Sequence, residues 1–303
     1  MRIIFYGTPL FAVASLQKIV DHGFDVIAVV TSPDKPAGRG MQLQQSAVKQ
    51  YALSQNLEVI QPVNLKSPEF MEQLNALKPE LQVIIAFRML PEIVWNFPPM
   101  GTINLHASLL PNYRGAAPIN RAIMNGETTT GVTTFFLKHE IDTGNILLQK
   151  EVEILPEDDA GTLHDKLMDI GADLVVASLK KIKTGNLETK PQLMLATNTP
   201  APKIFTVDCE IHWDQPIQKV HNQIRGLSPY PGAFTTYQDK ILKIYKGYYL
   251  TDENVKPGNF EMDTNKQFRI SAIDGWYYPT LVQPEGKRKM PVEDFVNGLR
   301  KIH

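Results

Sequence analysis

Cysteine is almost absent from this sequence of 303 residues, in which Cys209 is the only one. A single cysteine excludes an internal disulfide and a cysteine-rich zinc site. No apolar run approaches the roughly 20 residues that a membrane-spanning helix needs. The apolar start, MRIIFYGTPLFAV, is interrupted at Gly7-Thr8-Pro9, and no small-residue cleavage site follows. We therefore expect a cytoplasmic protein without a signal peptide and without a membrane partner.

Neither sign of charge dominates, and several common catalytic motifs are missing. The formal net charge is −1, which excludes a strongly basic nucleic-acid coat, although residues 203–303 hold 14 Lys and Arg against 12 Asp and Glu. The sequence has no GxGxxG, no GxxxxGK followed by Ser or Thr, and no GxSxG, so dinucleotide, P-loop and serine-hydrolase fingerprints are absent. Its seven histidines never form HxH or HExxH, and no metal is expected.

The first 155 residues alternate short apolar runs with amphipathic stretches. Strands are predicted over Arg2–Tyr6, Asp25–Val30, Glu58–Ile60, Leu81–Ala86 and Thr102–His106, and helices over Leu10–His22, Ser46–Gln55, Ser67–Leu77 and Ala116–Asn125. Continuous apolar runs fit strands buried on both faces, and the alternation favours an open, mostly parallel α/β sheet with helices on both sides. Ligands of such sheets bind beyond the carboxyl ends of the strands, so we expect the chemistry there.

The rest of the chain changes character twice. Two apolar runs precede a long helix predicted over Thr162–Lys183, and a stretch with three prolines then indicates a linker. Short aromatic and β-branched runs after it indicate a small antiparallel barrel or sandwich, followed by a helix over Pro291–Leu299. We expect an α/β domain at residues 1–185, a linker at 186–204 and a β-barrel domain at 205–303.

The strand predicted at Thr102–His106 carries a chemical signal. Alternation puts Ile103 and Leu105 on one face, and Asn104 with His106 on the other. An amide and an imidazole at the carboxyl end of a strand can stabilise the negative charge that develops on a carbonyl oxygen. Alternatively, the amide and the imidazole have a structural role only and form hydrogen bonds with neighbouring groups. The strand alone does not decide between the catalytic and the structural interpretation.

Three other segments place charged residues in turn-rich sequence. Arg114 precedes a predicted helix start and either binds an anion with it or lies on the surface. The triplet Asp142-Thr143-Gly144 forms a turn in which Asp142 hydrogen-bonds its own backbone, or it supplies a carboxylate that sets the protonation state of His106 or takes a proton through water. This single Asp-Thr-Gly triplet does not indicate an aspartic protease, because that chemistry needs two such aspartates that share a proton. The glycine-rich loop at 33–49 presents Arg39 to a phosphate or nucleic acid, or to solvent.

These residues lie in longer stretches through which the chain resembles the folate-dependent formyltransferases over essentially its whole length. The stretches are FYGTPLFA at 5–12, SPDKPAGRG at 32–40, INLHASLLPNYRGAAPIN at 103–120, IDTGNIL at 141–147, NQIRGLSPYPGAF at 222–234 and LVQPEGKRKMPVEDFVNG at 281–298. The run Asn-x-His-x-Ser-Leu-Leu-Pro, with Asp-x-Gly downstream, marks the whole superfamily. The PDKPAGRG and PEGKRKM segments are similar to those of the members that formylate methionyl-tRNA.

The resemblance implies a Rossmann-like formyltransferase domain followed by an OB-like, tRNA-binding barrel. The implied reaction moves the formyl group of 10-formyltetrahydrofolate, the formyl donor, to the α-amino group of methionine on initiator tRNA, and the enzyme is expected to act as a monomer. Asn104 and His106 would form the catalytic pair at the oxyanion, and Asp142 would orient His106 and relay a proton from the attacking nitrogen. Folate contacts are implied for Phe87, Arg88, Met89, Leu90, Ser108, Leu109, Leu110, Pro111 and Ile141, and tRNA contacts for Arg39, Lys287, Arg288 and Lys289.

Two other functions stay open. Formyl transfer to a small amine, such as a nucleotide sugar or a purine precursor, would use the same catalytic residues, but a small substrate needs no second binding surface. A non-catalytic RNA-binding module with a retained folate pocket would not require Asn104, His106 and Asp142.

Overall fold

The computed structural model describes residues 1–37, 42–186, 188–193, 198–253 and 255–300. Contacts along the chain divide it into two compact units. Unit 1 comprises residues 1–115, 131–152 and 164–200, and unit 2 comprises residues 116–130, 153–163 and 201–303. Each unit has its own sheet and its own hydrophobic core. Within the described ranges, no helix combines the length and the apolar character needed to cross a membrane.

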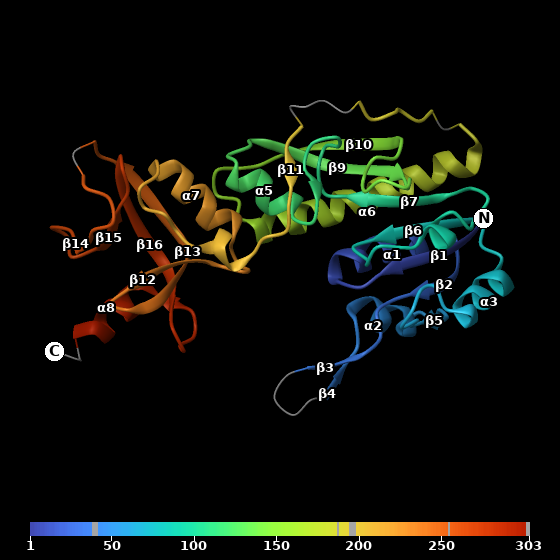
Figure 1. Cartoon of the computed structure of the whole chain (residues 1–303), viewed down its shortest axis with the longest axis horizontal. Coiled ribbons are helices and arrows are strands. Elements are labelled where there is room, and N and C mark those ends of the chain that lie inside the picture. The colour runs from blue at the N-terminus through green and yellow to red at the C-terminus, as the bar shows by residue number, and fades with distance from the viewer. Residues whose placement is uncertain (38–41, 187, 194–197, 254, 301–303) are drawn as a thin grey trace. The chain divides into compact units, whose positions relative to one another are not determined.

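Unit 1 is built on a sheet of seven strands among the described residues (Figure 1). The order is β10-β9-β7-β6-β1-β2-β5, with β1 (Arg2–Gly7), β2 (Asp25–Val30), β5 (Val59–Ile60), β6 (Leu81–Ile85), β7 (Thr102–His106), β9 (Thr129–Phe136) and β10 (Ile146–Glu153). Neighbouring strands from β5 to β7 are parallel, and β9 is antiparallel to β7. The apolar runs of β1 and β6 are buried, as parallel strands covered on both faces require. The predicted mostly parallel α/β sheet is confirmed.

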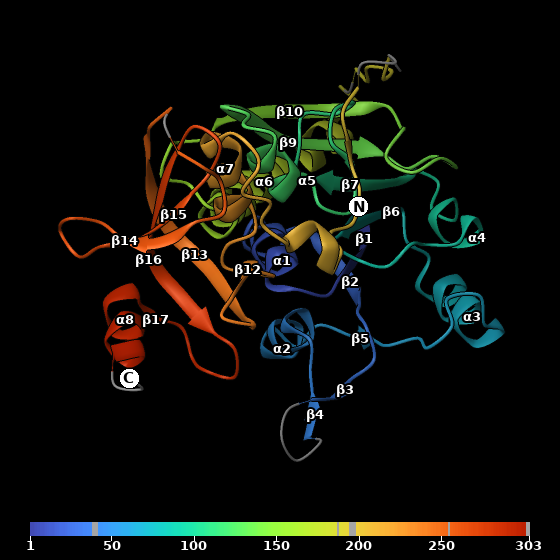
Figure 2. The ribbon, with the colours of Figure 1, turned by 60° about the vertical axis from the view of Figure 1, so that its left-hand side comes forward.

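Helices pack on both faces of this sheet (Figures 1 and 2). One face is covered by α3 (Pro68–Leu77) and α4 (Glu92–Trp95), which share a core with side chains of β1, β2 and β6. The other is covered by α1 (Leu10–Asp21) and α6 (Ala160–Thr184), while α2 (Ala47–Ser54) packs against α1. The hydroxyls of Ser46 and Ser67 accept hydrogen bonds from the first turns of α2 and α3, which explains where these helices begin.

Unit 2 contains an antiparallel sheet in the order β12-β13-β16-β15-β14, with β17 paired to β16. Its strands are β12 (Ala233–Tyr237), β13 (Lys240–Thr251), β14 (Phe260–Met262), β15 (Phe268–Ser271), β16 (Gly275–Pro284) and β17 (Met290–Pro291). Two helices, α7 (Ile217–Gly226) and α8 (Val292–Arg300), pack against the sheet, and α5 (Pro118–Met124) packs against α7. The predicted small antiparallel β domain is confirmed, but Pro291 ends β17 and the closing helix begins only at Val292.

Several elements of the structure are not among those predicted from the sequence. The helix α7 follows Pro216 and has Ile217, Val220 and Ile224 on its buried side, so its helical spacing was visible in the sequence. Strands β3 (Lys35–Ala37) and β4 (Gln42–Gln44) pair within the expected loop at 33–49. The other unpredicted elements are short: α4, β8 (Arg114–Gly115), β11 (Pro200–Ala201), the 3-10 helix Thr206–Cys209, β14 and β17.

Candidate active site

The carboxyl end of β7 carries Asn104 and His106 on one face of the strand, as the alternation predicts. In the antiparallel register with β9, Asn104 lies opposite Phe135 and His106 opposite Thr133. Ile103 on the other face is fully buried. Asn104 is partly exposed while His106 is almost fully buried, so the amide lies nearer to solvent than the imidazole.

The two ring nitrogens of His106 face different partners. Nε2 lies 2.7 Å from the carbonyl oxygen of Tyr113, and Nδ1 lies 3.7 Å from Oδ2 of Asp142. Because a carbonyl oxygen only accepts, Nε2 carries a hydrogen and donates it, and Nδ1 is the nitrogen that can gain or lose a proton. The side chains of His106 and Asp142 are only 9% and 11% exposed, which strengthens their electrostatic interaction relative to water.

The turn that carries Asp142 is tightly packed and its backbone is unusual. Asp142 has φ 55°, in the left-handed region that residues other than glycine seldom adopt. At Gly144 a Cβ atom would lie 1.5 Å from the carbonyl oxygen of Phe136, so only glycine fits. The Asp142 carboxylate also accepts a hydrogen bond from the backbone of Gly115 at 3.3 Å. The triplet is therefore both a turn and the source of a carboxylate that faces His106.

Gln192, which sequence reasoning did not single out, binds this turn. Its Nε2 donates to the carbonyl oxygens of Asp142 at 2.9 Å and Gly144 at 2.7 Å. Its Oε1 accepts from Nε of Arg114 at 3.2 Å, and from Nη2 of the same guanidinium. Burial lowers the pKa of Arg114, and the charges of Asp142 and Glu140 act in the opposite direction. No local pattern marks Gln192, because it lies 50 residues from Asp142 in the sequence.

Leu137 packs against two core clusters, each of which contains one residue with an implied folate contact. The larger cluster contains Leu90 and the smaller one contains Leu110. Met89 and Ile141 are 75% and 61% exposed, so each presents apolar surface to solvent. This exposed apolar surface is of the kind that a ring system can cover on binding.

The other members of these segments differ in their surroundings. Phe87 lies edge-on to the buried Tyr6, with ring centroids 5.7 Å apart. Arg88 donates to the carbonyl oxygens of Pro62 and of Val63. Ser108 is fully buried, and its hydroxyl donates to the carbonyl of Asn112 at 2.7 Å. Leu109 and Pro111 are partly exposed beside it.

The loop expected to contact nucleic acid is held at its base. Arg39 itself lies outside the described residues. Nζ of Lys49 lies 2.6 Å from Oδ2 of Asp34 and 2.7 Å from Oε1 of Gln61, and Nε2 of Gln61 donates to Oδ1 of Asp34 at 2.8 Å. The hydrogen bonds from Lys49 and Gln61 lower the pKa of Asp34. This triad joins the start of the loop to α2 and to the end of β5.

The basic segment of unit 2 is exposed after β16. Lys287, Arg288 and Lys289 all lie at the surface. Nζ of Lys289 lies 3.6 Å from the ring centroid of Tyr245 and donates to a backbone carbonyl at 3.2 Å. Burial and the neighbouring Lys243 lower the pKa of Lys289. Lys243 lies on β13, 46 residues before Lys289 in the sequence, so no local pattern relates the two lysines.

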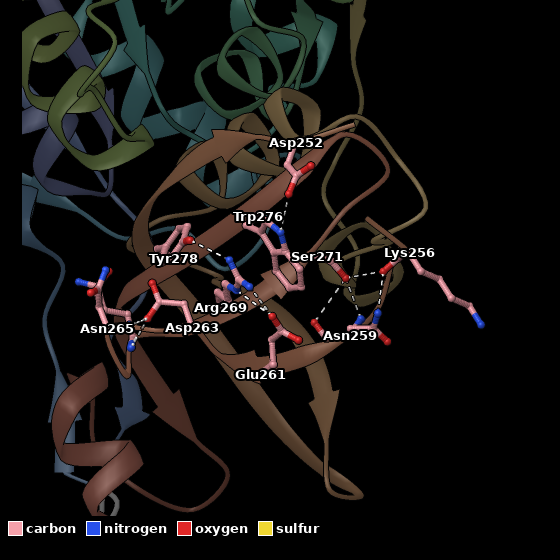
Figure 3. Close-up of polar contacts among 11 residues, drawn as sticks. Asp252, Lys256, Asn259, Glu261, Asp263, Asn265, Arg269, Ser271, Trp276 and Tyr278 are labelled. Carbon is pink, nitrogen blue, oxygen red and sulfur yellow. Dashed lines mark hydrogen bonds and ion pairs between the residues drawn. The ribbon is translucent and has the colours of Figure 1, made fainter. Parts of the chain in front are cut away.

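A further polar cluster in unit 2 is satisfied by contacts within the sheet (Figure 3). Nε of Arg269 donates to Glu261 at 3.0 Å, and its guanidinium lies 3.9 Å from the ring centroid of Trp276. The indole of Trp276 donates to Asp252 at 3.3 Å. These contacts join β14 to β15 and β16. Because the carboxylate of Glu261 neutralises the charge of Arg269, the cluster adds no basic surface. In the described part of the chain, no group of His, Cys, Asp and Glu is arranged to hold a metal ion.

The fold is an α/β sheet in which Asn104 and His106 lie on one face of β7 near its carboxyl end, and the carboxylate of Asp142 faces the imidazole. Residues 1–179 match the family model described as "Formyl transferase", and residues 203–300 match "Formyl transferase, C-terminal domain". The chain belongs to the formyl transferase family.

Relatives match along nearly the whole chain. The methionyl-tRNA formyltransferase of Parabacteroides distasonis is 48% identical, covering 100% of this chain and 97% of the relative. That of Flavobacterium johnsoniae is 46% identical, covering 99% and 96%.

Solved structures share the fold. The N-formyltransferase from Helicobacter canadensis in complex with folinic acid and dTDP-3-aminofucose matches with a TM-score of 0.70 and 23% identity, covering 95% of this chain and 99% of the other. HypX from Aquifex aeolicus in complex with tetrahydrofolic acid matches with a TM-score of 0.67 and 18% identity, covering 98% and 47%. At these identities the likeness shows the fold alone.

Proposed function

We propose that this formyltransferase acts on charged initiator tRNA. It transfers the formyl group of 10-formyltetrahydrofolate to the α-amino group of methionine, giving N-formylmethionyl-tRNA for translation initiation. Identity of 48% to a methionyl-tRNA formyltransferase over the full length supports this pair of substrates. The observation that carries the chemistry is His106, held by Tyr113 through Nε2 and facing Asp142 through Nδ1. The active species is proposed to be a cytoplasmic monomer.

The first step is attack of the amine on the formyl carbon. A nitrogen–carbon bond forms, and the bond between that carbon and N10 of the folate later breaks. Negative charge develops on the formyl oxygen, where the side-chain amide of Asn104 donates a hydrogen bond. Loss of one such donor costs about 3–4 kcal/mol of transition-state stabilisation.

The second requirement is a proton transfer. The attacking nitrogen becomes positively charged and must lose a proton, while N10 must gain one before it leaves. Nδ1 of His106 can accept and return this proton, since Nε2 is already committed to Tyr113. The Asp142 carboxylate at 3.7 Å stabilises the imidazolium that forms. General acid–base catalysis of this kind contributes about 10²–10⁴-fold.

The two substrates are assigned to different parts of the chain. We assign folate binding to residues 87–90, residues 108–111 and Ile141, where the exposed side chains of Met89 and Ile141 offer apolar surface to the pterin. Contacts with tRNA are assigned to the loop with Arg39 and to the basic patch with Lys287, Arg288 and Lys289. A catalytic domain at 1–185, a linker at 186–204 and a tRNA-binding domain at 205–303 remain the proposed organisation, supported by the family matches to residues 1–179 and 203–300.

The test is the transfer of labelled formyl from 10-formyltetrahydrofolate, offered to charged initiator and charged elongator methionine tRNA in parallel. Formylation of the initiator alone is expected. A third reaction contains a nucleotide-linked amino sugar in place of tRNA. Formylation of the sugar and of neither tRNA would replace the proposal with the small-amine function.

A further inference from the structure

Gln192 lies in the segment that follows α6, and no step of the reaction described above uses it. We propose that Gln192 is a positioning residue, which holds the turn at Asp142 so that the carboxylate faces Nδ1 of His106. This inference rests on the proposed function, because it assigns Gln192 a part in the same formyl transfer.

The hydrogen bonds of Gln192 use both ends of its amide. One NH₂ group donates to the carbonyl oxygens on either side of Thr143, those of Asp142 and Gly144, at 2.9 and 2.7 Å. The amide oxygen accepts from the guanidinium of Arg114. Among side chains of this length, only glutamine supplies two donor hydrogens and a separate acceptor. The contact therefore depends on the amide itself and not on side-chain volume.

The backbone holds Gln192 against the turn. Ile146 and Lys190 exchange two backbone hydrogen bonds, of 2.8 and 2.9 Å, two residues before Gln192. The hydroxyl of Thr189 accepts from Nδ2 of Asn145 at 3.2 Å. These bonds attach the segment to the strand that leaves the turn, so Gln192 is placed without depending on its own side-chain contacts.

Thr199 contacts the loop that holds the other partner of His106. The carbonyl oxygen of Thr199 accepts from the backbone of Tyr113 at 2.6 Å, and the backbone of Thr199 donates to Oδ1 of Asn112 at 3.3 Å. The carbonyl of Tyr113 in turn accepts from Nε2 of His106. Gln192 thus reaches the turn that faces Nδ1, and Thr199 reaches the loop that faces Nε2.

Three variants measure this role at saturating initiator tRNA and 10-formyltetrahydrofolate. Gln192→Ala is expected to lower kcat about 10- to 100-fold, because small displacements of a catalytic group have effects of this size, with both KM values within threefold. Gln192→Glu keeps the acceptor for Arg114 but loses both donors, and is expected to be impaired at least as strongly. The matched control is Leu193→Ala, whose side chain is 74% exposed, and it should retain wild-type kcat. Wild-type kcat in Gln192→Glu would overturn the proposal, since the donors would then be dispensable.

A double-mutant cycle separates positioning from a general structural role. Asp142→Asn is expected to lower the single-turnover rate of formyl transfer by itself. Adding Gln192→Ala to this variant is expected to reduce that rate less than threefold further. Equal factors in both backgrounds would show that Gln192 acts independently of Asp142 and would overturn the proposal, as would full activity of Asp142→Asn. If the wild-type protein formylates no methionyl-tRNA, the proposed function fails. If the wild type is active and the Gln192 variants match it, only this inference fails.

Discussion

Gly144→Ala is expected to damage catalysis through the backbone of the turn. The added Cβ would lie 1.5 Å from the carbonyl oxygen of Phe136 and 2.7 Å from its carbonyl carbon, both backbone atoms of β9. The turn must therefore move by about 2 Å to reach an ordinary contact distance, and overpacking of this kind costs about 1–3 kcal/mol of stability. Asp142 is two residues away, and a displacement of 1 Å at a catalytic group can cost about 10²-fold in rate. We expect kcat to fall about 100-fold or more.

The assay compares kcat and both KM values of Gly144→Ala with those of the wild type, together with the free energy of unfolding in urea. Gly298→Ala is the matched control: Gly298 lies in α8 and a Cβ there meets no atom within 4 Å. That variant should gain about 0.5–1 kcal/mol of stability and keep wild-type activity. A Gly144→Ala enzyme with kcat within threefold of the wild type would refute the argument that the turn geometry sets the position of Asp142.

Three other predictions concern single side chains. His106→Ala should reduce kcat at least 10²-fold without unfolding the protein, because Nδ1 is the only proton acceptor beside Asp142 in the site as described; near-normal kcat with a native circular dichroism spectrum would contradict the mechanism. Burial, and to a lesser extent the charge of Arg225, lowers the pKa of His221 from 6.5 to about 4. The unfolded chain therefore takes up a proton at His221 more readily than the folded protein, so the free energy of unfolding is highest above pH 6.5 and falls as the pH drops towards 4. His221→Phe should remove about 1–3 kcal/mol of the difference in unfolding free energy between pH 7 and pH 4; identical pH dependence of the two proteins in urea titrations would exclude this. Lys287→Ala with Arg288→Ala should raise KM for initiator tRNA and reduce its salt dependence, with KM for folate unchanged; a change in folate KM alone would show that the patch is misassigned.

Local sequence pattern predicted much of unit 1. The apolar runs at β1 and β6 indicated strands buried on both faces, and both strands are buried. The alternation in β7 placed Asn104 and His106 on one face, because side chains alternate along any strand. The helix α7 was not predicted, although its apolar residues have helical spacing, and strands β3 and β4 have only three residues each, too few for alternation to identify them.

The sequence by itself determined most of the strands and helices of unit 1 and the candidate residues for the chemistry. Period and residue type are local properties, and they identified Asn104, His106 and Asp142 as candidates before any contact between them was known. Only the tertiary structure decided that Nδ1 of His106 faces Asp142 at 3.7 Å. It alone showed that Gln192, 50 residues from Asp142 in the sequence, holds that turn. These contacts form where the carboxyl end of β7, the turn at Asp142 and the segment after α6 come together. Where they come together depends on the packing of the whole unit and not on the period of any one stretch.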